Sequence, residues 1–155
     1  MKDQTFPRMH VGYYVSDIAK TVDFYKRFFE AEPVKVKSDY AKFILTAPSL
    51  NISFIESEQA IQPSFIHFGI EVDNPEHLRQ KLGNALRQNL TIDEEKEVKC
   101  CYAKQDKFWV EDPDGYKWEV YHFKENVEIN DPKYSKEGSC CAPAKEEEQE
   151  PVCCQ

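Results

Sequence analysis

Two histidines and one glutamate stand at positions suited to holding a metal ion. His10 and His67 each open a segment that fits the pattern H-x-G-x-x-V-x-[DN], over residues 10–17 and again over residues 67–74. Glu119 lies in a third β-prone segment, where a buried carboxylate is costly unless it is paired or bound to metal. Two imidazoles and one carboxylate form the set typical of non-haem Fe(II), which keeps open positions for dioxygen and substrate. We therefore predict His10, His67 and Glu119 as metal ligands and catalytic residues. Fe(II) is the expected ion, and Zn, Mn, Co and Ni are chemically possible.

Each histidine also has a simpler interpretation. A single histidine in a strand is more often a hydrogen-bonded core residue than a ligand, but two at matched repeat positions favour metal binding. His77 follows Pro75 and Glu76 in a first helical turn, so we expect it on the surface. His122 alternates to the strand face opposite Glu119 and is excluded as a ligand.

The six cysteines occur as three adjacent pairs, which are Cys100-Cys101, Cys140-Cys141 and Cys153-Cys154. Neighbouring Cα atoms lie about 3.8 Å apart, below the roughly 4.4 to 6.8 Å of ordinary disulfides. Such pairs tend to remain dithiols, which suit a soft, thiol-seeking ion or metalloid. Adjacent side chains of a regular strand point in opposite directions, so convergence of the first pair requires a bulge or loop near residues 99–102, which we expect to be mobile.

The two histidine segments begin two similar halves of the chain. Each is a short β-rich run that ends in an Asx residue, a good helix N-cap, and is followed by an apolar stripe at helical spacing. Three extended segments follow in each half, and the last two of the second half flank a turn at residues 112–115. The predicted fold is α+β, with two βαβββ modules. Each module is a curved mixed sheet with a helix outside, and the concave faces together enclose a metal cleft.

Strand alternation assigns side chains to the two faces of each sheet. In the first strand the apolar face holds Val11, Tyr13 and Val15, which leaves His10 and Gly12 on the other face. The second copy repeats this arrangement, with Ile66, Phe68, Ile70 and Val72 on one face and His67 and Gly69 on the other. Because the apolar faces must meet the helices, we expect both histidines to face the cleft, and each glycine to leave room for a ligand.

Composition narrows the class of protein and its partners. The 155 residues fit one domain, and the formal charge of -8, from 28 acidic and 20 basic residues, disfavours nucleic acid and anionic membranes as partners. Neither a secretory signal nor an apolar run of about 18 residues is present, so we expect a cytoplasmic protein.

We predict a domain over residues 1–125, with modules at about 5–58 and 64–124. Residues 126–155 are expected to form a disordered acidic tail. The role of its thiols at Cys140, Cys141, Cys153 and Cys154 stays open between metal or metalloid capture and an inert or redox-sensitive appendage.

The two modules with their ligand set resemble the vicinal oxygen chelate superfamily, which includes glyoxalase I, extradiol dioxygenases and antibiotic-resistance proteins. Residues 38–43, residues 100–107 with the run Cys-Cys-Tyr-Ala-Lys, Trp109 and residues 112–115 are similar to the ArsI/CadI branch. This branch contains Fe(II)-dependent carbon–arsenic lyases. The resemblance implies dioxygen-dependent cleavage of trivalent methyl- or aryl-arsenicals to arsenite. It also implies that Cys100, Cys101, Tyr102 and Lys104 contact the substrate. Lys104 and Lys107 either favour thiolate at the pair or are solvated loop charges.

Two other functions are also compatible with the sequence. The six thiols suit a resistance protein that sequesters cadmium or arsenite without turnover. A glyoxalase-type isomerase commonly draws a fourth ligand, a glutamate, from the last strand of the first module. Here that strand offers Asn51 and Ser53 on its polar side, which weakens the isomerase hypothesis. The sequence does not distinguish methyl from aromatic substrates, or a monomer from a homodimer.

Overall fold

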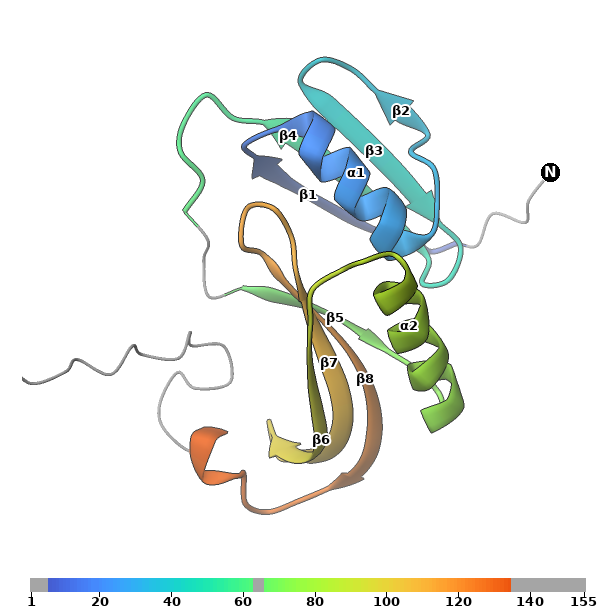
Figure 1. Ribbon diagram of the computed structural model, residues 1–155, viewed down its shortest axis with the longest axis vertical. Coiled ribbons are helices and arrows are strands. Elements are labelled where there is room, and N and C mark those ends of the chain that lie inside the picture. Colours follow the sequence, from blue (N-terminus) through green and yellow to red (C-terminus); the bar gives the residue numbers. More distant parts are fainter. Residues whose placement is uncertain (1–5, 63–65, 135–155) are drawn as a thin grey trace, which may run out of the picture.

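Two modules of the same design follow each other along the chain (Figure 1). The computed structural model describes residues 6–62 and 66–134. The first module consists of β1 (Met9–Val15), α1 (Ile18–Phe29), β2 (Lys35–Val36), β3 (Tyr40–Leu45) and β4 (Leu50–Glu56). The second consists of β5 (His67–Glu71), α2 (Pro75–Arg87), β6 (Ile92–Cys100), β7 (Ala103–Glu111) and β8 (Lys117–Asn126), followed by a 3-10 turn, η1 (Pro132–Tyr134). The predicted order βαβββ, twice, is therefore confirmed.

The strands form two separate four-stranded mixed sheets. Their orders are β1-β4-β3-β2 and β5-β8-β7-β6. In each sheet the first strand of the module runs parallel to the last, and the remaining pairs are antiparallel. The crossover between the two parallel strands consists of the helix and the two intervening strands of the module. Each histidine segment thus lies at the edge of its sheet, beside the last strand of its own module.

Both helices begin at the Asx residues predicted from the sequence. The Asp17 side chain accepts a hydrogen bond from the Lys20 amide at 2.9 Å, and the Asn74 side chain accepts one from the His77 amide at 2.8 Å. Each cap satisfies one of the amide groups that the first helical turn leaves without a partner. These caps fix where the chain turns from the edge strand into the helix, and hence where the histidine strand ends.

The helix-covered faces of the two sheets meet in a shared aromatic core. Tyr13 of β1 stacks on Phe68 of β5 at a ring-centroid distance of 5.5 Å. Trp118 of β8 packs against Phe28 and Phe29 of α1 at 5.4 and 5.5 Å. The modules are therefore joined through their apolar faces, and the helix-free faces that carry the histidines stay outside this contact.

A buried polar network lies within this core. The Asp112 carboxylate accepts hydrogen bonds from the Tyr25 hydroxyl at 2.8 Å and from the amides of Asp114 and Tyr116 at 3.0 and 2.9 Å. The Trp118 indole donates to the Tyr25 hydroxyl at 3.0 Å. These hydrogen bonds tie the predicted turn at residues 112–115 to α1 of the other module. Burial nevertheless raises the pKa of Asp112, and the hydrogen bonds offset that effect only in part.

The packed part of the chain continues past residue 125, where the tail was predicted to begin. Val127, Asn130 and Asp131 hydrogen-bond to the β6–β7 hairpin, and Tyr134 reaches Glu95. Residues 126–134 therefore contact the domain, which the acidic composition of the tail did not predict. Residues 135–155, with the four remaining cysteines, lie outside the described residues. In the described part of the chain, no helix has the length and apolar character that crossing a membrane requires.

Candidate active site

His67 and Glu119 meet on the helix-free face of the second sheet. The His67 Nε2 atom lies 3.5 Å from Glu119 Oε1, and both side chains are largely buried. Gly69 pairs with Glu119 in the parallel register of β5 and β8. A Cβ atom at Gly69 would lie 3.3 Å from the Glu119 carboxylate, so the glycine leaves the space that this carboxylate occupies. Strand alternation thus correctly places His67 and Glu119 on one face, whereas the room that Gly69 was expected to leave for a ligand stays a prediction.

His10 does not join this pair within one chain. It lies on β1 with Gly12 and Tyr14, on the face of the first sheet away from α1, and all three are exposed. Within residues 6–62 and 66–134, no three His, Cys, Asp or Glu side chains come close enough to hold a metal ion. The structure thus brings together two of the three predicted ligands and leaves the third on the outer face of the other module.

Within the part of the chain that the structure describes, the sheet face around His10 also lacks the ligands of a complete metal site. In the β1–β4 register His10 pairs with Asn51, and Gly12 pairs with Ser53. The Asn51 Oδ1 atom is buried and has no hydrogen-bond partner among the described residues. Ser53 occupies the position that Glu119 holds in the second module, and it bonds to Tyr40 at 2.9 Å. This face therefore offers one imidazole and one unsatisfied amide oxygen, but no carboxylate at the counterpart of Glu119.

The vicinal cysteines lie at the tip of the β6–β7 hairpin. Cys100 is the last residue of β6 and is buried, whereas Cys101 is exposed. Cys101 and Tyr102 both have positive φ angles, 54° and 60°, so they are the two central residues of a tight turn. The Cys100 and Cys101 Sγ atoms are 3.5 Å apart. The departure from regular strand geometry that was predicted near residues 99–102 is confirmed, and it makes the thiols converge.

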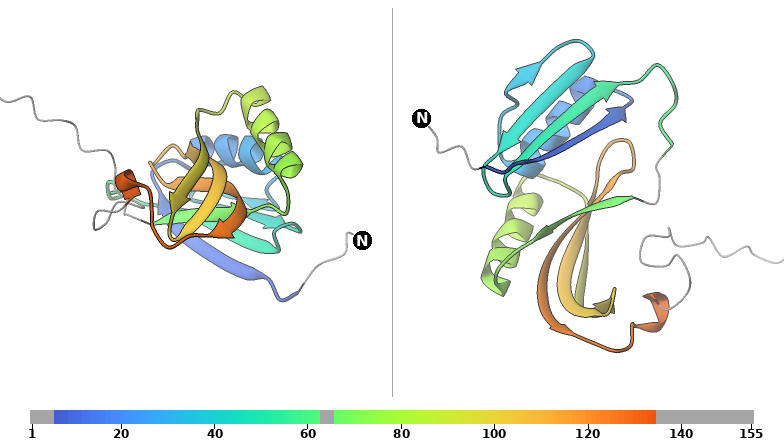
Figure 2. Two further views of the ribbon diagram at one scale, coloured as in Figure 1. Left: turned by 90° about the horizontal axis from the view of Figure 1, so that it is seen from below. Right: turned by 180° about the vertical axis from the view of Figure 1, so that it is seen from behind.

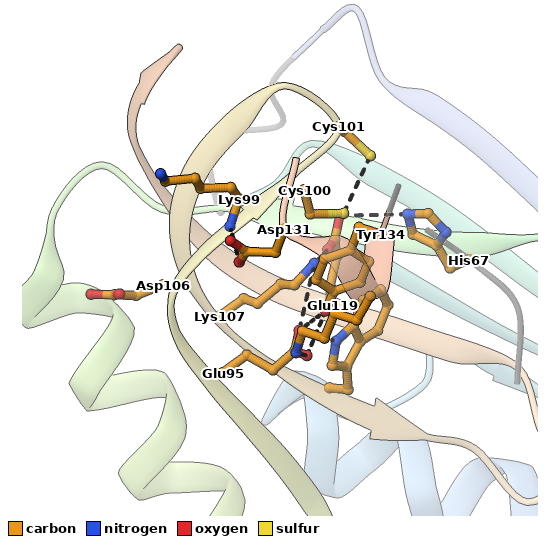
Figure 3. Close-up of polar contacts among 12 residues, drawn as sticks. His67, Glu95, Lys99, Cys100, Cys101, Asp106, Lys107, Glu119, Asp131 and Tyr134 are labelled. Carbon is orange, nitrogen blue, oxygen red and sulfur yellow. Dashed lines mark hydrogen bonds and ion pairs between the residues drawn. The ribbon is translucent and has the colours of Figure 1, made fainter. Parts of the chain in front are cut away.

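The dithiol and the His67–Glu119 pair share one side of the second sheet. Figure 3 shows the Cys100 side chain pointing toward His67, with Glu119 and Lys107 farther along the same face. The Trp109 ring packs edge-on against the His67 ring at 5.4 Å. A small molecule held by the two sulfur atoms would therefore lie next to the imidazole–carboxylate pair.

Comparisons with known proteins agree with this architecture. A family model described as the Glyoxalase/Bleomycin resistance protein/Dioxygenase superfamily matches residues 9–120. The chain belongs to this superfamily. A trivalent organoarsenical cleaving enzyme from Bacillus sp. (strain MD1) is 40% identical over 146 residues, which cover 86% of this chain and 89% of that protein. The cadmium-induced protein CadI from Mycobacterium tuberculosis (strain ATCC 25618 / H37Rv) is 30% identical, over 86% of this chain and 92% of that protein.

A solved structure supports the fold assignment. The glyoxalase/bleomycin resistance protein/dioxygenase from Alicyclobacillus acidocaldarius superposes with a TM-score of 0.65 at 15% identity, over 81% of this chain and 96% of that chain. At this identity the likeness concerns the fold alone. The paired βαβββ modules predicted from the repeat, and the glyoxalase-like fold implied by the resemblance, are therefore confirmed.

Lys104 and Tyr102, predicted to contact substrate, lie beside the dithiol in different ways. The Lys104 ammonium is 2.6 Å from a Glu97 carboxylate oxygen and 3.8 Å from one of Glu125. Its described partners are thus carboxylates, and these do not support a role in favouring thiolate. The Tyr102 side chain is 63% exposed at the turn next to Cys101. The Tyr102 side chain is therefore accessible to a ligand bound at the turn, and its contact with the substrate stays a prediction.

Lys107 occupies a position that differs from the one predicted for it. Its side chain is only 1% exposed, and its ammonium lies 3.3 Å from Glu119 Oε2 and 3.8 Å from Glu95 Oε2. It also lies 4.6 Å from the centroid of the Trp109 ring. Lys107 therefore compensates two largely buried carboxylates, one of them a candidate metal ligand. Period-two alternation against buried Phe108 and Val110 was the signal that could have located Lys107 and Trp109 on this face.

Replacing Lys107 with methionine should destabilise the metal-free protein. The substitution keeps the apolar stem but leaves Glu95 and Glu119 without their buried cation. Breaking a buried pair costs about 3 kcal/mol of the free energy of unfolding. Urea denaturation measures this change. Lys96→Met is the matched control, because Lys96 is exposed and forms a surface ion pair with Glu94 at 3.1 Å. We expect that control to change the free energy by less than about 1 kcal/mol. Equal effects of the two substitutions would contradict the role assigned to Lys107.

Glu95 joins the residues after β8 to the site. Its carboxylate is bound by Lys133, by the Tyr134 hydroxyl and by the Trp109 indole. Burial alone would raise the pKa of Glu95, but these hydrogen bonds and the Lys107 charge together lower it. Tyr134 is affected in the opposite direction, because burial and the Glu95 carboxylate raise the pKa of its hydroxyl. Both shifts favour the ionised carboxylate and the neutral phenol, which is the state that holds this contact.

The lowered pKa of Glu95 predicts a specific loss of stability in acid. A carboxyl group that binds protons less readily in the folded state stabilises that state fully above its unfolded pKa, about 4.3. This contribution is lost as the pH falls through the lower folded-state pKa. We therefore expect the wild-type protein to lose more free energy of unfolding than Glu95→Gln between pH 7 and pH 3. Urea titrations of both proteins across this range measure the difference. Parallel curves would show that Glu95 does not contribute to this loss.

Proposed function

We propose that this protein cleaves the carbon–arsenic bond of trivalent organoarsenicals and releases arsenite. We further propose that the active unit is a homodimer. Each of its sites would combine His67, Glu119 and the dithiol of one chain with His10 of a second copy. The observation that carries the proposal is the 3.5 Å separation of the Cys100 and Cys101 sulfur atoms on the face that bears the His67–Glu119 pair.

The dithiol suits the substrate class. A trivalent arsenical with one organic group has two hydroxyl groups that thiols can displace. The two cysteines would form two sulfur–arsenic bonds and release two water molecules, with no change of oxidation state. The second bond forms within one complex and is therefore strongly favoured over two separate thiols. Arsenic held in this way keeps its organic group, which would extend from the turn toward His67.

The names of relatives support the same substrate class. The Bacillus protein at 40% identity is called a trivalent organoarsenical cleaving enzyme, and proteins of Bacillus subtilis (strain 168) and Thermomonospora curvata carry similar names at 36% and 31% identity. The alignments include most of this chain. The arsenical is therefore a better-supported substrate than the glutathione adducts of a glyoxalase. The serine at the counterpart of Glu119 in the first module also weighs against a four-ligand glyoxalase site.

The available side chains fit a divalent transition metal. His67 and Glu119 already lie 3.5 Å apart, Gly69 leaves room beside the carboxylate, and His10 stands exposed on a face with an unsatisfied amide oxygen at Asn51. Together they offer the two imidazoles and one carboxylate that suit Fe(II). When bound, Fe(II) would supply the redox chemistry with dioxygen as co-substrate. Lys107 would hold the Glu119 carboxylate in place, and Trp109 would limit rotation of the His67 ring.

One experiment tests the proposed activity. Full-length protein with reduced thiols is loaded anaerobically with Fe(II), and methylarsenite and air are then added while arsenite release is followed. We expect turnover that depends on both iron and air, with background release from Glu119→Ala or from protein loaded with Zn(II). Absence of arsenite, with iron bound and thiols reduced, would reject the lyase mechanism.

The second candidate is a resistance protein that sequesters metal or arsenic through thiols. The 30% identity to cadmium-induced proteins favours it over a glyoxalase-type isomerase. The Glu119→Ala substitution separates sequestration from cleavage. A sequestering protein would still protect cells from methylarsenite after this change. A lyase would lose turnover and keep its affinity for the arsenical.

A further inference from the structure

The Cys100–Cys101 turn has a backbone conformation that its own residues disfavour. A two-residue turn with both φ angles positive is usually built from Asn-Gly or similar pairs, because side chains with a Cβ crowd the backbone there. Here the two positions hold Cys101 and Tyr102, at φ angles of 54° and 60°. Non-glycine residues persist in this region only where the surroundings hold them. The turn therefore depends on contacts from elsewhere in the chain.

Those contacts come from residues 127–134, which we call the strap. The Asp131 carboxylate accepts from the Lys99 amide at 2.8 Å, and the Asp131 amide donates to the Lys99 carbonyl at 2.8 Å. The Asn130 side chain accepts from the Tyr102 amide at 2.8 Å, and the Val127 amide donates to the Tyr102 carbonyl at 2.9 Å. Both backbone groups of Lys99 and of Tyr102 are thus bound by the strap, on either side of the two cysteines.

The strap is itself fixed to the sheet at its far end. Lys133 and Tyr134 both bind the Glu95 carboxylate, which lies opposite Lys107 in the β6–β7 register. The Tyr134 amide donates to the Asp131 carbonyl at 2.8 Å, which closes the 3-10 turn. Figure 3 shows Tyr134 between the dithiol and Glu119, and Asp131 beside Lys99. The strap therefore connects the turn to the charged residues next to the candidate metal ligands.

From this geometry we infer that Asn130 and Asp131 are positioning residues, which hold the Cys100 and Cys101 thiols in the converging arrangement needed to chelate an arsenical. The inference rests on the proposed function. Without the strap, the turn would relax toward conformations in which neighbouring side chains diverge. One thiol could then still react with arsenic, but closure of the second sulfur–arsenic bond would be less favourable. We therefore predict that chelation of the arsenical weakens, whereas each thiol by itself keeps its reactivity.

The test compares variants that lose the acceptor oxygen with variants that keep it. The background is the full chain with Cys140, Cys141, Cys153 and Cys154 changed to serine, so that only one dithiol remains. Asn130→Leu and Asp131→Leu remove the acceptor at similar volume, whereas Asn130→Asp and Asp131→Asn retain it. The dissociation constant for phenylarsine oxide is measured by competition with a small dithiol, without metal and without air.

The leucine variants and the variants that keep the acceptor oxygen should differ clearly in their dissociation constants. Because each leucine variant loses one side-chain hydrogen bond to the turn, we expect the dissociation constant to rise roughly five- to tenfold. The variants that keep the acceptor should stay within about twofold of the background protein. The alkylation rate of exposed Cys101 by iodoacetamide should not change by more than about twofold in any of them. A purely structural defect would change this rate and the urea midpoint together with the affinity.

Two results would overturn the inference. The first is unchanged affinity in both leucine variants. The second is an affinity loss that parallels a loss of folded protein in urea. Arsenical binding needs neither metal nor dioxygen, so these results are independent of turnover. Failure of Fe(II)-loaded protein to release arsenite would reject the proposed lyase but leave the role of the strap to be decided by the dissociation constants.

Discussion

A mixture of two inactive variants, His10→Ala and Glu119→Ala, should recover about a quarter of the wild-type rate of arsenite release. Each variant alone should lose more than about a hundredfold, because loss of even an outer hydrogen-bond partner of a metal ligand costs 10- to 100-fold. If the site combines His67 and Glu119 of one chain with His10 of another, random exchange gives about half heterodimers. Each heterodimer contains one site with all three ligands and one site with neither His10 nor Glu119.

The physical reason is the way in which the modules meet. Tyr13, Phe68 and Trp118 join the apolar faces of the two sheets within one chain. Consequently the face with His10 and the face with His67 point away from this core; His10 is exposed, and the His67 side chain is 28% exposed. In Figure 2 the two sheets are seen from two further directions, with each helix on one side of its sheet. Exposed Tyr14 and Ile55 beside His10 are apolar surface that an interface would bury.

A matched control makes the complementation specific. His67→Ala and Glu119→Ala affect ligands that lie on the same chain, so their mixture contains no complete site and should remain inactive. Co-expression replaces mixing if the subunits exchange slowly, and light scattering records the mass of each sample. A monomeric wild-type protein with full activity would contradict the shared site, and so would recovery in the control mixture.

The sequence predicted the strands and faces because these follow from local periodicity. Alternation placed Glu119 on the other strand face from Trp118 and Val120, as the structure confirms. The Asx residues Asp17 and Asn74 correctly marked the helix starts. Each of these features depends on neighbours within a few residues. The contact of His67 with Glu119 was also predictable, because paired strands at matched repeat positions bring the same faces together.

Other parts of the site depend on contacts that alternation does not describe. Periodicity gives the face of a residue but not which faces pack together, so it left open whether His10 and His67 meet within one chain. The ionic role of Lys107 requires knowing that Glu95 lies opposite it across the β6–β7 register. The strap was missed because its composition is that of a polar tail. Its contacts use Asn and Asp side chains and backbone groups, with no apolar pattern to reveal them.

Changing either Cys100 or Cys101 to serine should weaken binding of methylarsenite by about 10² to 10⁴. This range is what a second bond within the same complex contributes over a single attachment. If Cys140, Cys141, Cys153 and Cys154 are serine as well, the double variant retains no thiol, and it should not bind methylarsenite measurably. Metal affinity should stay within about twofold, because neither sulfur belongs to the proposed ligand set. Competition with a small dithiol measures the arsenical, and calorimetry with Mn(II) in place of Fe(II) measures the metal site.

The tail cysteines provide the control for this prediction. Changing Cys140, Cys141, Cys153 and Cys154 to serine removes four of the six thiols but leaves the turn at Cys100 and Cys101 intact. For a lyase this variant should keep its rate of arsenite release, whereas a sequestering protein would lose most of its capacity. If the single variants at Cys100 and Cys101 kept both affinity and turnover while the tail variant lost them, the turn would not be the arsenical site. The short distance between its sulfur atoms would then have no catalytic meaning, and the tail thiols would bind the substrate.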